Sequence, residues 1–403
     1  MTQGPWPLKP LLDVVDLLDS QRVPVKAADR TVRPGDVPYY GATGQVGFID
    51  RPLFDEPLLL LGEDGVPFLD PYKPKAYLID GPAWVNNHAH VIRVREGLLR
   101  PFLLHALNSF DYRGHVNGTT RLKLTQAAMR SMTVPVPDLG EQRQIVEILE
   151  SHLSHLDAAD ASLALAMGRA GALLNAELDA AVWGDPTPTV QVGSLLAEPM
   201  RNGRSDRAVE GSSGTRTLTL TAVTKREFSD RYTKLTSTPP KIAEGLWLRP
   251  GDILVQRSNT PELVGTSARY DGPERWAIFP DLLIRLRVDE SRIDGRYMAA
   301  ALRSPRTHRA LKSKAKGLAG SMPKIDQATI GAATIPLPDR GAQIAAIESV
   351  SAAEERVDRL VEVVHLQRAR GAALRRAVLA AAFSGRLTGA STDTEIIEEM
   401  AEA

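Results

Sequence analysis

Two long stretches of the chain carry apolar side chains at intervals of three, four and seven residues, with no proline inside them. The first extends from Gln142 to Ala181 and the second from Gln343 to Phe383. This spacing predicts two helices, and about 40 residues of helix extend about 60 Å. Because packing of an apolar face supplies most of the stability of a helix in a protein, we expect the two helices to pair as an antiparallel coiled coil. Gly168 and Gly171 are the positions at which the first helix could bend or break.

Both helices begin with the same motif. Residues 134–138, Val-Pro-Val-Pro-Asp, precede Gln142, and residues 335–339, Ile-Pro-Leu-Pro-Asp, precede Gln343. The offset, 343 − 142 = 201, is half the length of the chain and holds as far as Gly385. Such a long period indicates two copies of one architecture rather than a solenoid of short repeats. Each copy is a variable region followed by a fixed helix.

The start of the first helix also has the spacing of a capping box. Asp138 is placed to cap the helix, and Glu141 follows three residues later. In the second copy Ala342 stands where the glutamate would be. We therefore expect the second helix start to be the weaker of the two.

Shorter patterns in the variable regions predict a mixed α/β fold. Alternating and β-branched residues indicate strands near residues 37–50, 58–61, 84–92, 215–223, 246–257 and 276–288. Helices are expected at residues 98–110 and 297–316. The predicted class is α+β, with two mixed α/β domains separated by a pair of long antiparallel helices in a pseudo-twofold internal repeat. The predicted segments are residues 1–137 (first variable domain), 138–185 (first fixed helix), 186–337 (second variable domain) and 338–403 (second fixed helix and C-terminal tail).

The charges are unevenly distributed, although 49 basic residues balance 49 acidic ones. Residues 138–185 contain 2 basic and 9 acidic residues, a net charge of −7, and residues 186–337 contain 24 and 15, a net charge of +9. The second variable region is therefore suited to the phosphate backbone of a nucleic acid.

Cysteine is absent, which excludes disulfides and thiolate metal sites and suits a reducing cytoplasm. No apolar run approaches the ~20 residues of a membrane span, and the N-terminus has no signal-peptide pattern. We expect a cytoplasmic protein without membrane contact.

The motifs of several enzyme classes are missing from the sequence. It contains no Gly-x-x-x-x-Gly-Lys-Ser/Thr phosphate-binding loop, no Asn-Pro-Pro-aromatic stretch for amino-methylation of adenine, and no nucleophile elbow. Pro280-Asp281 could begin a nuclease motif, but the nearest substitute for its Glu-x-Lys is Glu290-Ser291-Arg292. The sequence therefore predicts a binding protein rather than an enzyme.

Several short motifs follow one another in a fixed order and cover most of the chain. They are Tyr39-Tyr40-Gly41-Ala42-Thr43-Gly44-Gln45-Val46-Gly47, Gly62-Glu63-Asp64-Gly65, Trp84-Val85-Asn86-Asn87-His88, Pro250-Gly251-Asp252-Ile253-Leu254, the two helix starts, and Leu379-Ala380-Ala381-Ala382-Phe383-Ser384-Gly385-Arg386-Leu387. No single motif is specific, but the ordered set resembles the specificity subunit of type I restriction-modification systems.

The resemblance implies two target-recognition domains, each reading one half of an interrupted DNA sequence in the major groove, held apart by the two helices. It implies a subunit without catalysis or cofactors of its own. The implied partners are double-stranded DNA, two methyltransferase subunits and two restriction/translocase subunits, and the methyl donor and ATP bind to those partners. The alternative that the residues leave open is a coiled-coil scaffold that organises a complex without reading DNA sequence.

In the second variable region, two groups of residues have side chains suited to DNA. A basic, glycine-bearing loop after the helix at 297–316 suits phosphates, although a solvated helix end is the alternative. The end of the strand at 246–257 carries side chains suited to base edges, although Arg257 could instead pair with Asp252. The candidate residues are Lys312, Lys314, Lys316, Ser321 and Lys324 in the loop, and Gln256, Arg257, Asn259 and Thr260 at the strand end.

In the first variable region, the residues equivalent to that loop are Thr119, Thr120, Arg121 and Lys123. A glycine-rich turn offers a second group, Tyr39, Tyr40, Thr43 and Gln45, whose role is either DNA contact or purely structural. His88 and His90 alternate along a strand and hint at metal. Because no third ligand lies near them in sequence, we expect a structural role for both.

Overall fold

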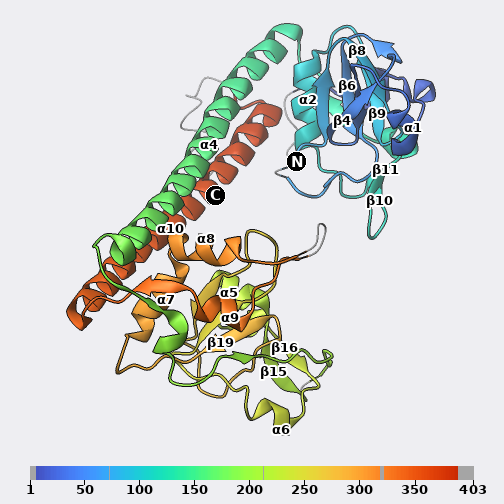
Figure 1. Ribbon diagram of the computed structural model, residues 1–403. Helices are drawn as coiled ribbons and strands as arrows, with labels where there is room; N and C mark the ends of the chain where they lie inside the picture. Colours follow the sequence, from blue (N-terminus) through green and yellow to red (C-terminus); the bar gives the residue numbers. More distant parts are fainter. Residues whose placement is uncertain (1–5, 72, 212, 318–321, 389–403) are drawn as a thin grey trace. The chain divides into compact units, whose positions relative to one another are not determined.

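The computed structural model describes residues 6–71, 73–211, 213–317 and 322–388 (Figure 1). The chain divides into two compact units. The first unit comprises residues 1–164 and 364–403, and the second unit comprises residues 165–363. Each of the two long helices therefore contributes one part to each unit.

Both predicted long helices are present, and each is somewhat longer than expected. Helix α4 spans Leu139–Trp183 and helix α10 spans Arg340–Ser384, and each has 45 residues. The Asp138 carboxylate accepts a hydrogen bond from the Glu141 backbone N–H at 2.9 Å, and Asp339 accepts one from Ala342 at 2.9 Å. The N-cap is thus equal in both helices, because the aspartate alone supplies it.

Within each unit, α4 and α10 carry side chains that pair with one another. In the first unit Arg375 pairs with Asp157, and Arg368 pairs with Asp160 at 2.8 Å. Since the higher-numbered aspartate pairs with the lower-numbered arginine, the two helices run antiparallel, as predicted. In the second unit Arg356 pairs with Glu177 at 2.5 Å. The acidic residues of α4 thus face arginines of α10, and α4 continues through Gly168 and Gly171 without a break.

The first unit contains two four-stranded sheets (Figure 1). One is antiparallel, in the order β2-β9-β6-β7. The other has the order β4-β3-β8-β5, and β3 pairs with β8 in parallel. The strands are β2 (Val15–Leu17), β3 (Val37–Gly41), β4 (Gly44–Ile49), β5 (Phe54–Asp55), β6 (Leu58–Gly62), β7 (Ala76–Ile79), β8 (Pro82–Val85) and β9 (Ala89–Val94).

Helix α2 (Arg100–Ser109) buries Phe102, Leu103, Ala106 and Leu107, and these side chains share a core with α4 and α10. Shorter elements complete the unit. They are β1 (Leu8–Pro10), η1 (Leu11–Asp13), η2 (Asp19–Gln21), α1 (Ala27–Thr31), β10 (Val116–Asn117), β11 (Lys123–Leu124), α3 (Gln126–Met129) and β12 (Thr133–Pro135).

The second unit is built around one four-stranded antiparallel sheet, in the order β14-β19-β17-β18. Its strands are β14 (Arg201–Asn202), β17 (Ile253–Gln256), β18 (Ser267–Arg269) and β19 (Leu283–Leu286). A hairpin of β15 (Thr215–Leu218) and β16 (Thr233–Thr236) lies beside it. The remaining elements are β13 (Thr189–Gln191), η3 (Val192–Leu195), α5 (Leu220–Lys225), η4 (Asp230–Tyr232), α6 (Pro240–Ala243), α7 (Gly295–Arg303), α8 (Pro305–Ser313), α9 (Gln327–Gly331) and β20 (Thr334–Pro336).

The internal repeat is visible in the strand pairing of the two units. In the first unit β1 pairs with β12, so that Leu8 faces Pro135. In the second unit β13 pairs with β20, so that Thr189 faces Pro336. In both units this small antiparallel pair leads directly into a long helix.

Several sequence-based boundaries were wrong, each for a local reason. The helix expected at 297–316 is two helices, because Pro305 lacks the N–H that would continue α7 and instead begins α8. The strand expected at 84–92 is two strands, β8 and β9, joined by a turn in which the Asn86 side chain accepts a hydrogen bond from the His88 N–H at 2.8 Å. Of the strand expected at 215–223, only Thr215–Leu218 is extended, and α5 follows.

No helix in the described part of the chain is long and apolar enough to cross a membrane.

Candidate nucleic-acid interface

Lys123 and Lys324 occupy equivalent places in the two units. In the first unit Lys123 forms a β-bridge with Asp64, and the next residue, Leu124, donates its N–H to the Glu63 carbonyl at 2.8 Å. In the second unit Lys324 forms a β-bridge with Ser258, and the next residue, Ile325, donates its N–H to the Arg257 carbonyl at 2.8 Å. Each lysine therefore lies beside the segment that follows the central strand, β6 or β17.

The segment that each lysine faces differs in charge between the units. In the first unit it is Glu63-Asp64, and the Lys123 ammonium pairs with the Glu63 carboxylate at 2.9 Å. In the second unit it is Arg257-Ser258, and no ion pair of Lys324 is found among the described residues. The first surface is thus neutralised internally, whereas the second keeps its positive charge, in line with the net charge of +9 in that region.

The loop before Lys123 is fixed by a glycine and an ion pair. Gly118 has φ +113°, and a Cβ there would lie 2.3 Å from the Arg121 carbonyl oxygen, so that only glycine fits. The Arg121 guanidinium pairs with Asp64 at 2.5 Å and is 60% exposed. Thr119 and Thr120 are exposed at the tip. Because Arg121 and Lys123 are already paired, they would have to exchange partners to bind a phosphate.

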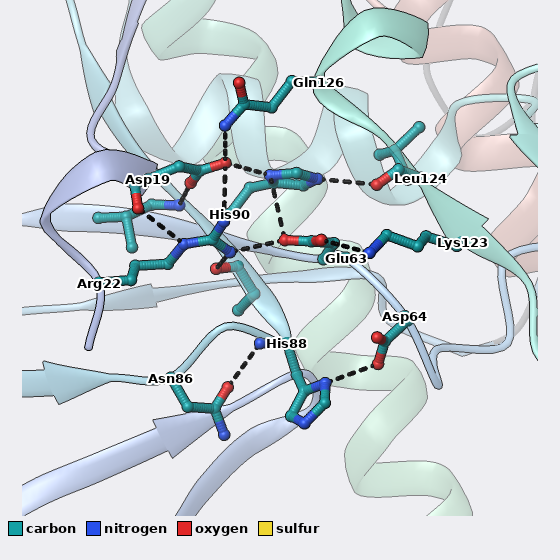
Figure 2. A network of polar contacts seen from close by, with 12 residues as sticks. Asp19, Arg22, Glu63, Asp64, Asn86, His88, His90, Lys123, Leu124 and Gln126 are labelled. Carbon is teal, nitrogen blue, oxygen red and sulfur yellow. Dashed lines mark hydrogen bonds and ion pairs between the residues drawn. The ribbon is translucent and has the colours of Figure 1, made fainter. Parts of the chain in front are cut away.

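A buried polar network holds this loop to the sheet (Figure 2). At its centre, His90 on β9 contacts the Asp19 carboxylate through Nδ1 at 2.6 Å and the Leu124 carbonyl through Nε2 at 3.0 Å. Both partners are oxygen acceptors, so each ring nitrogen lies within hydrogen-bonding distance of an acceptor. Gln126 also donates to Asp19, at 2.7 Å. The network therefore connects the N-terminal segment, β9 and β11.

Glu63 closes the network on its exposed side. Its carboxylate pairs with Arg22 at 2.7 Å as well as with Lys123 (Figure 2). Burial raises the pKa of Glu63, but the hydrogen bonds from Lys123 and Arg22 outweigh it and hold the pKa below its usual 4.5. Burial likewise raises the pKa of Asp19, and the hydrogen bond and charge of His90 outweigh it, so that the pKa lies below 3.8.

Asp19, Glu63 and His90 have ligand atoms within 4.8 Å of one another, the arrangement of a possible metal site. These ligand atoms already have partners within the protein. Arg22 and Lys123 pair with the Glu63 carboxylate, and His90 Nδ1 contacts the Asp19 carboxylate. His88 likewise has a protein partner, since its Nδ1 lies 2.9 Å from Asp64 (Figure 2). The contacts of both histidines match the structural role expected from the sequence.

In the second unit, two candidate groups that are far apart in sequence lie together. Lys316 and Lys324 exchange two backbone hydrogen bonds of 2.8 Å, and Ile325 continues this contact to Arg257. The side chains of Lys312, Lys314, Lys316 and Lys324 are exposed, as is Thr260. Ser321 lies outside the described residues. The described lysines and Arg257 thus form one basic surface at the end of β17.

The alternative ion pair between Arg257 and Asp252 is not formed. Asp252 is 2% exposed, and its carboxylate binds the Arg287 guanidinium at 2.6 Å. Arg257 is half-buried, and its guanidinium has no hydrogen bond or ion pair with another described residue. Its charge is therefore available to a ligand.

Two candidate residues are buried, and their assignment to the DNA-binding surface is corrected. Tyr39 is 1% exposed, and its hydroxyl donates to the Val25 carbonyl at 3.2 Å. Gln256 is fully buried, and its amide donates to the Leu220 carbonyl at 3.0 Å. Both side chains belong to the core: Tyr39 is at an inward-facing position of β3, and Gln256 ends β17, whose four residues are all buried.

The side chains of the other candidates differ in exposure and in their contacts. Asn259 is half-buried and donates to the Gln256 side-chain oxygen at 2.6 Å. Tyr40 is half-buried, with its ring centroid 6.0 Å from that of Tyr77. Thr43 and Gln45 are exposed at the turn between β3 and β4.

Sequence reasoning missed Asp19, Arg22 and Gln126, the partners that complete the network in Figure 2. Asp19 and His90 are 71 positions apart, and no spacing rule joins a 3₁₀ turn to a distant strand. The only signal was the pair of family-like motifs containing Glu63, Asp64 and His88, which the fold brings together.

Comparison with known proteins identifies the relatives of this chain. A profile of the type I restriction modification DNA specificity domain matches residues 4–160. A Haemophilus influenzae protein named as a type I restriction enzyme specificity subunit is 34% identical over 143 residues, which are 36% of this chain and only 36% of that relative. The StySPI specificity subunit of Salmonella potsdam is 26% identical over 324 residues, covering 72% of this chain and 68% of the relative. The EcoKI specificity subunit of Escherichia coli K12 is 25% identical over 318 residues, with the same coverage.

Solved structures share the fold at low sequence identity. A chain from a structure of the assembling type I R-M system matches 96% of this chain with a TM-score of 0.69 and 18% identity. The HsdS subunit from Thermoanaerobacter tengcongensis matches 96% with a TM-score of 0.50 and 18% identity. The profile places a type I restriction modification DNA specificity domain at residues 4–160, and over most of its length the chain is similar to type I restriction enzyme specificity subunits, whose fold it shares.

Proposed function

We propose that this chain is the DNA-reading specificity subunit of a type I restriction-modification complex, and that its two halves read the two parts of an interrupted target. The observation that carries the proposal is the equivalence of Lys123 and Lys324. One frame, repeated at an offset of 201 residues, presents two surfaces of different composition, Glu63-Asp64 and Arg257-Ser258. A constant frame with a variable surface is what two readers of different base sequences require.

The candidate contacts fall into two groups under this proposal. The exposed lysines of the second unit bind phosphates and position the domain, because an ammonium group carries no base preference. Arg257 and Thr260, and Thr119, Thr120, Thr43 and Gln45 in the first unit, reach base edges. Arg121 and Lys123 act mainly in fixing their loop, since Asp64 and Glu63 hold them.

The same proposal covers catalysis and partners. The chain carries no reaction of its own and recruits two methyltransferase subunits and two restriction/translocase subunits, which bind the methyl donor and ATP. It acts on double-stranded DNA in the cytoplasm. The proposed domains are residues 1–137 and 186–337, with residues 138–185 and 338–403 as the helices that join them.

A domain exchange tests the proposal. Residues 186–337 are replaced by those of a relative with a different target, and the methylated sequence is determined in a host carrying each version. We expect one half of the target to change and the other half to stay the same. A change in both halves would refute the separate-reader assignment, and methylation that is unaffected by the exchange would favour the scaffold alternative.

A further inference from the structure

The second unit contains a polar cavity of about 520 Å³ that lies away from the basic surface described above. The cavity is lined by β14, β19 and the segment before β17. Ile253 at the start of β17 pairs with Leu286 near the end of β19, whereas Arg257 and the loop leave from the opposite end of β17. Five arginines (Arg201, Arg249, Arg275, Arg285 and Arg287) and two glutamates line the cavity, which gives the lining an excess of three positive charges.

Two buried or half-buried arginines at the back of the cavity share two carboxylates. Arg285 is 4% exposed, and its guanidinium donates to Glu198 Oε1 at 2.9 Å. Arg287 donates to the same oxygen at 3.2 Å and also pairs with the Asp252 carboxylate at 2.6 Å, so that the two guanidinium groups lie side by side on shared acceptors. Burial lowers the pKa of Arg285, and the charge of Arg287 lowers it further, although Asp252 and Glu198 oppose this. An anion entering the cavity would relieve this repulsion.

The arginine at the mouth of the cavity is free. Arg201 is exposed and forms no ion pair with any residue that the structure describes. The Arg201 guanidinium packs directly against Gly245. A Cβ at residue 245 would lie only 2.6 Å from the Arg201 Nη2. A larger residue at 245 would therefore displace this cation from the cavity.

An aromatic ring lies beside these cations. The Trp247 indole is half-buried in the lining, and the Arg275 guanidinium lies 5.8 Å from its ring centroid. Arg275 has φ 56°, a left-handed conformation that is uncommon outside glycine, and a two-pronged pair with Glu244 at 2.7 and 2.8 Å holds its side chain. Strained backbone of this kind concentrates at binding sites.

We propose that this cavity binds a phosphate group of a nucleotide, with Arg201 and Arg285 facing the phosphate and the Trp247 ring beside the base. The guanidinium group matches the phosphate oxygens in a two-pronged geometry, and an indole face is a stacking surface for any base. The volume falls within the range of small-molecule sites, about 300–1,000 Å³. The nucleotide comes either from solution or from a DNA strand, and the chemistry of the site is the same for both.

The first arm of the experiment measures binding of ADP and of inorganic phosphate to the full chain in its complex, by calorimetry. We expect saturable binding of both, with ADP the tighter ligand. Arg201→Gln should weaken both by about tenfold or more, and Trp247→Ala should reduce ADP to the affinity of phosphate. Arg204→Gln is the matched control, because Arg204 is exposed, pairs with Asp206 at 3.0 Å and lies outside the cavity lining.

The second arm separates the two sources of the phosphate. If a DNA duplex displaces ADP and Arg201→Gln weakens duplex binding, the ligand is a nucleotide of DNA. If ADP binds equally with and without duplex, the ligand is a free nucleotide. Both results support the phosphate site. It is overturned if neither ADP nor phosphate binds and Arg201→Gln leaves duplex binding unchanged, or if Arg204→Gln weakens binding as much as Arg201→Gln does.

Discussion

The buried side chains of Gln142 and Gln343 make matching hydrogen bonds in the two units. Gln142 Nε2 donates to the Pro137 carbonyl at 2.8 Å, and Gln343 Nε2 donates to the Pro338 carbonyl at 2.9 Å, in each case five residues back along the chain. Their Oε1 atoms accept the N–H of Leu99 at 2.7 Å and of Asp294 at 2.9 Å. Each glutamine thus ties the start of a long helix to the segment that leads into α2 or α7.

Replacing either glutamine with alanine should loosen its own unit. Each buried backbone group that loses its partner costs about 1–3 kcal/mol. Gln142→Ala removes the partner of the Leu99 N–H and of the Pro137 carbonyl, so we expect it to destabilise the first unit by about 2 kcal/mol or more. Hydrogen–deuterium exchange should accelerate at the Leu99 amide in Gln142→Ala and at the Asp294 amide in Gln343→Ala. The exposed neighbour Gln144 supplies the control, since Gln144→Ala should alter neither amide. Equal acceleration in both units by either change would contradict this.

Glu354 on α10 binds two arginines, and its removal should cost more than that of its neighbour. Its Oε1 accepts from both Arg226 and Arg303, and the Arg303 side chain is only 20% exposed. Glu354→Ala leaves two partly buried cations side by side, and we expect a loss of about 2 kcal/mol, less than for a fully buried pair. Glu355→Ala is the matched control, because the 71% exposed Glu355 makes only a 3.7 Å pair with Arg359 and should change stability by less than about 0.5 kcal/mol. Urea unfolding measures both, and equal losses would refute the shared-carboxylate explanation.

The sequence predicted the long helices well, because periodicity over 40 residues averages out local exceptions. Even Gly168 and Gly171 left α4 continuous, because a glycine inside a helix costs only about 1 kcal/mol relative to alanine. It predicted the short strands poorly. Residues 246–252 have a strand-like composition, but only Ile253–Gln256 pairs, because pairing is decided by a partner strand about 30 residues away.

The candidate site was also predicted only in part: the sequence gives the equivalence of the two halves but not the burial or ion pairing of their side chains. The offset of 201 residues is enough to place Lys123 and Lys324 in equivalent positions. Burial of Tyr39 followed from the register of β3, and burial of Gln256 from the interior place of β17 in its sheet, neither of which the sequence specified. The ion pair of Lys123 with Glu63 could not be predicted, because the two residues are far apart in sequence and only the fold brings the segment after β6 beside Lys123.

Acid should weaken the network around His90. Asp19 and Glu63 have pKa values in the folded protein below the usual 3.8 and 4.5. Groups with lowered pKa values contribute stability that is complete above their unfolded values and is lost as the pH falls through the folded ones. We expect the Val91 amide, which donates to Asp19 at 2.9 Å, to lose protection as the pH falls below about 4.

Asp19→Asn tests the cause of that acid sensitivity. It should lower Val91 protection at neutral pH and remove most of the pH dependence below about pH 4. Asp13→Asn is the control, because Asp13 is exposed and takes no part in the hydrogen bonds of the network. An acid transition of unchanged size in Asp19→Asn would show that other carboxylates are responsible.

The salt dependence of DNA binding should distinguish Lys324 from Lys123. Each phosphate neutralised by a cation adds about −0.9 to the slope of log K against log salt concentration. Lys324 has no ion pair among the described residues, so Lys324→Gln should reduce the magnitude of the slope by about 1. Lys123 already pairs with Glu63 at 2.9 Å, so Lys123→Gln should change the slope by much less.

The measurement is fluorescence anisotropy of the complex on its target duplex between about 50 and 200 mM salt. The control is Lys9→Gln, a change at an exposed lysine on β1. Equal slope changes for Lys324 and Lys123 would mean that the ion pair with Glu63 opens on DNA, and the difference in charge between the two surfaces would then not govern how they bind phosphate.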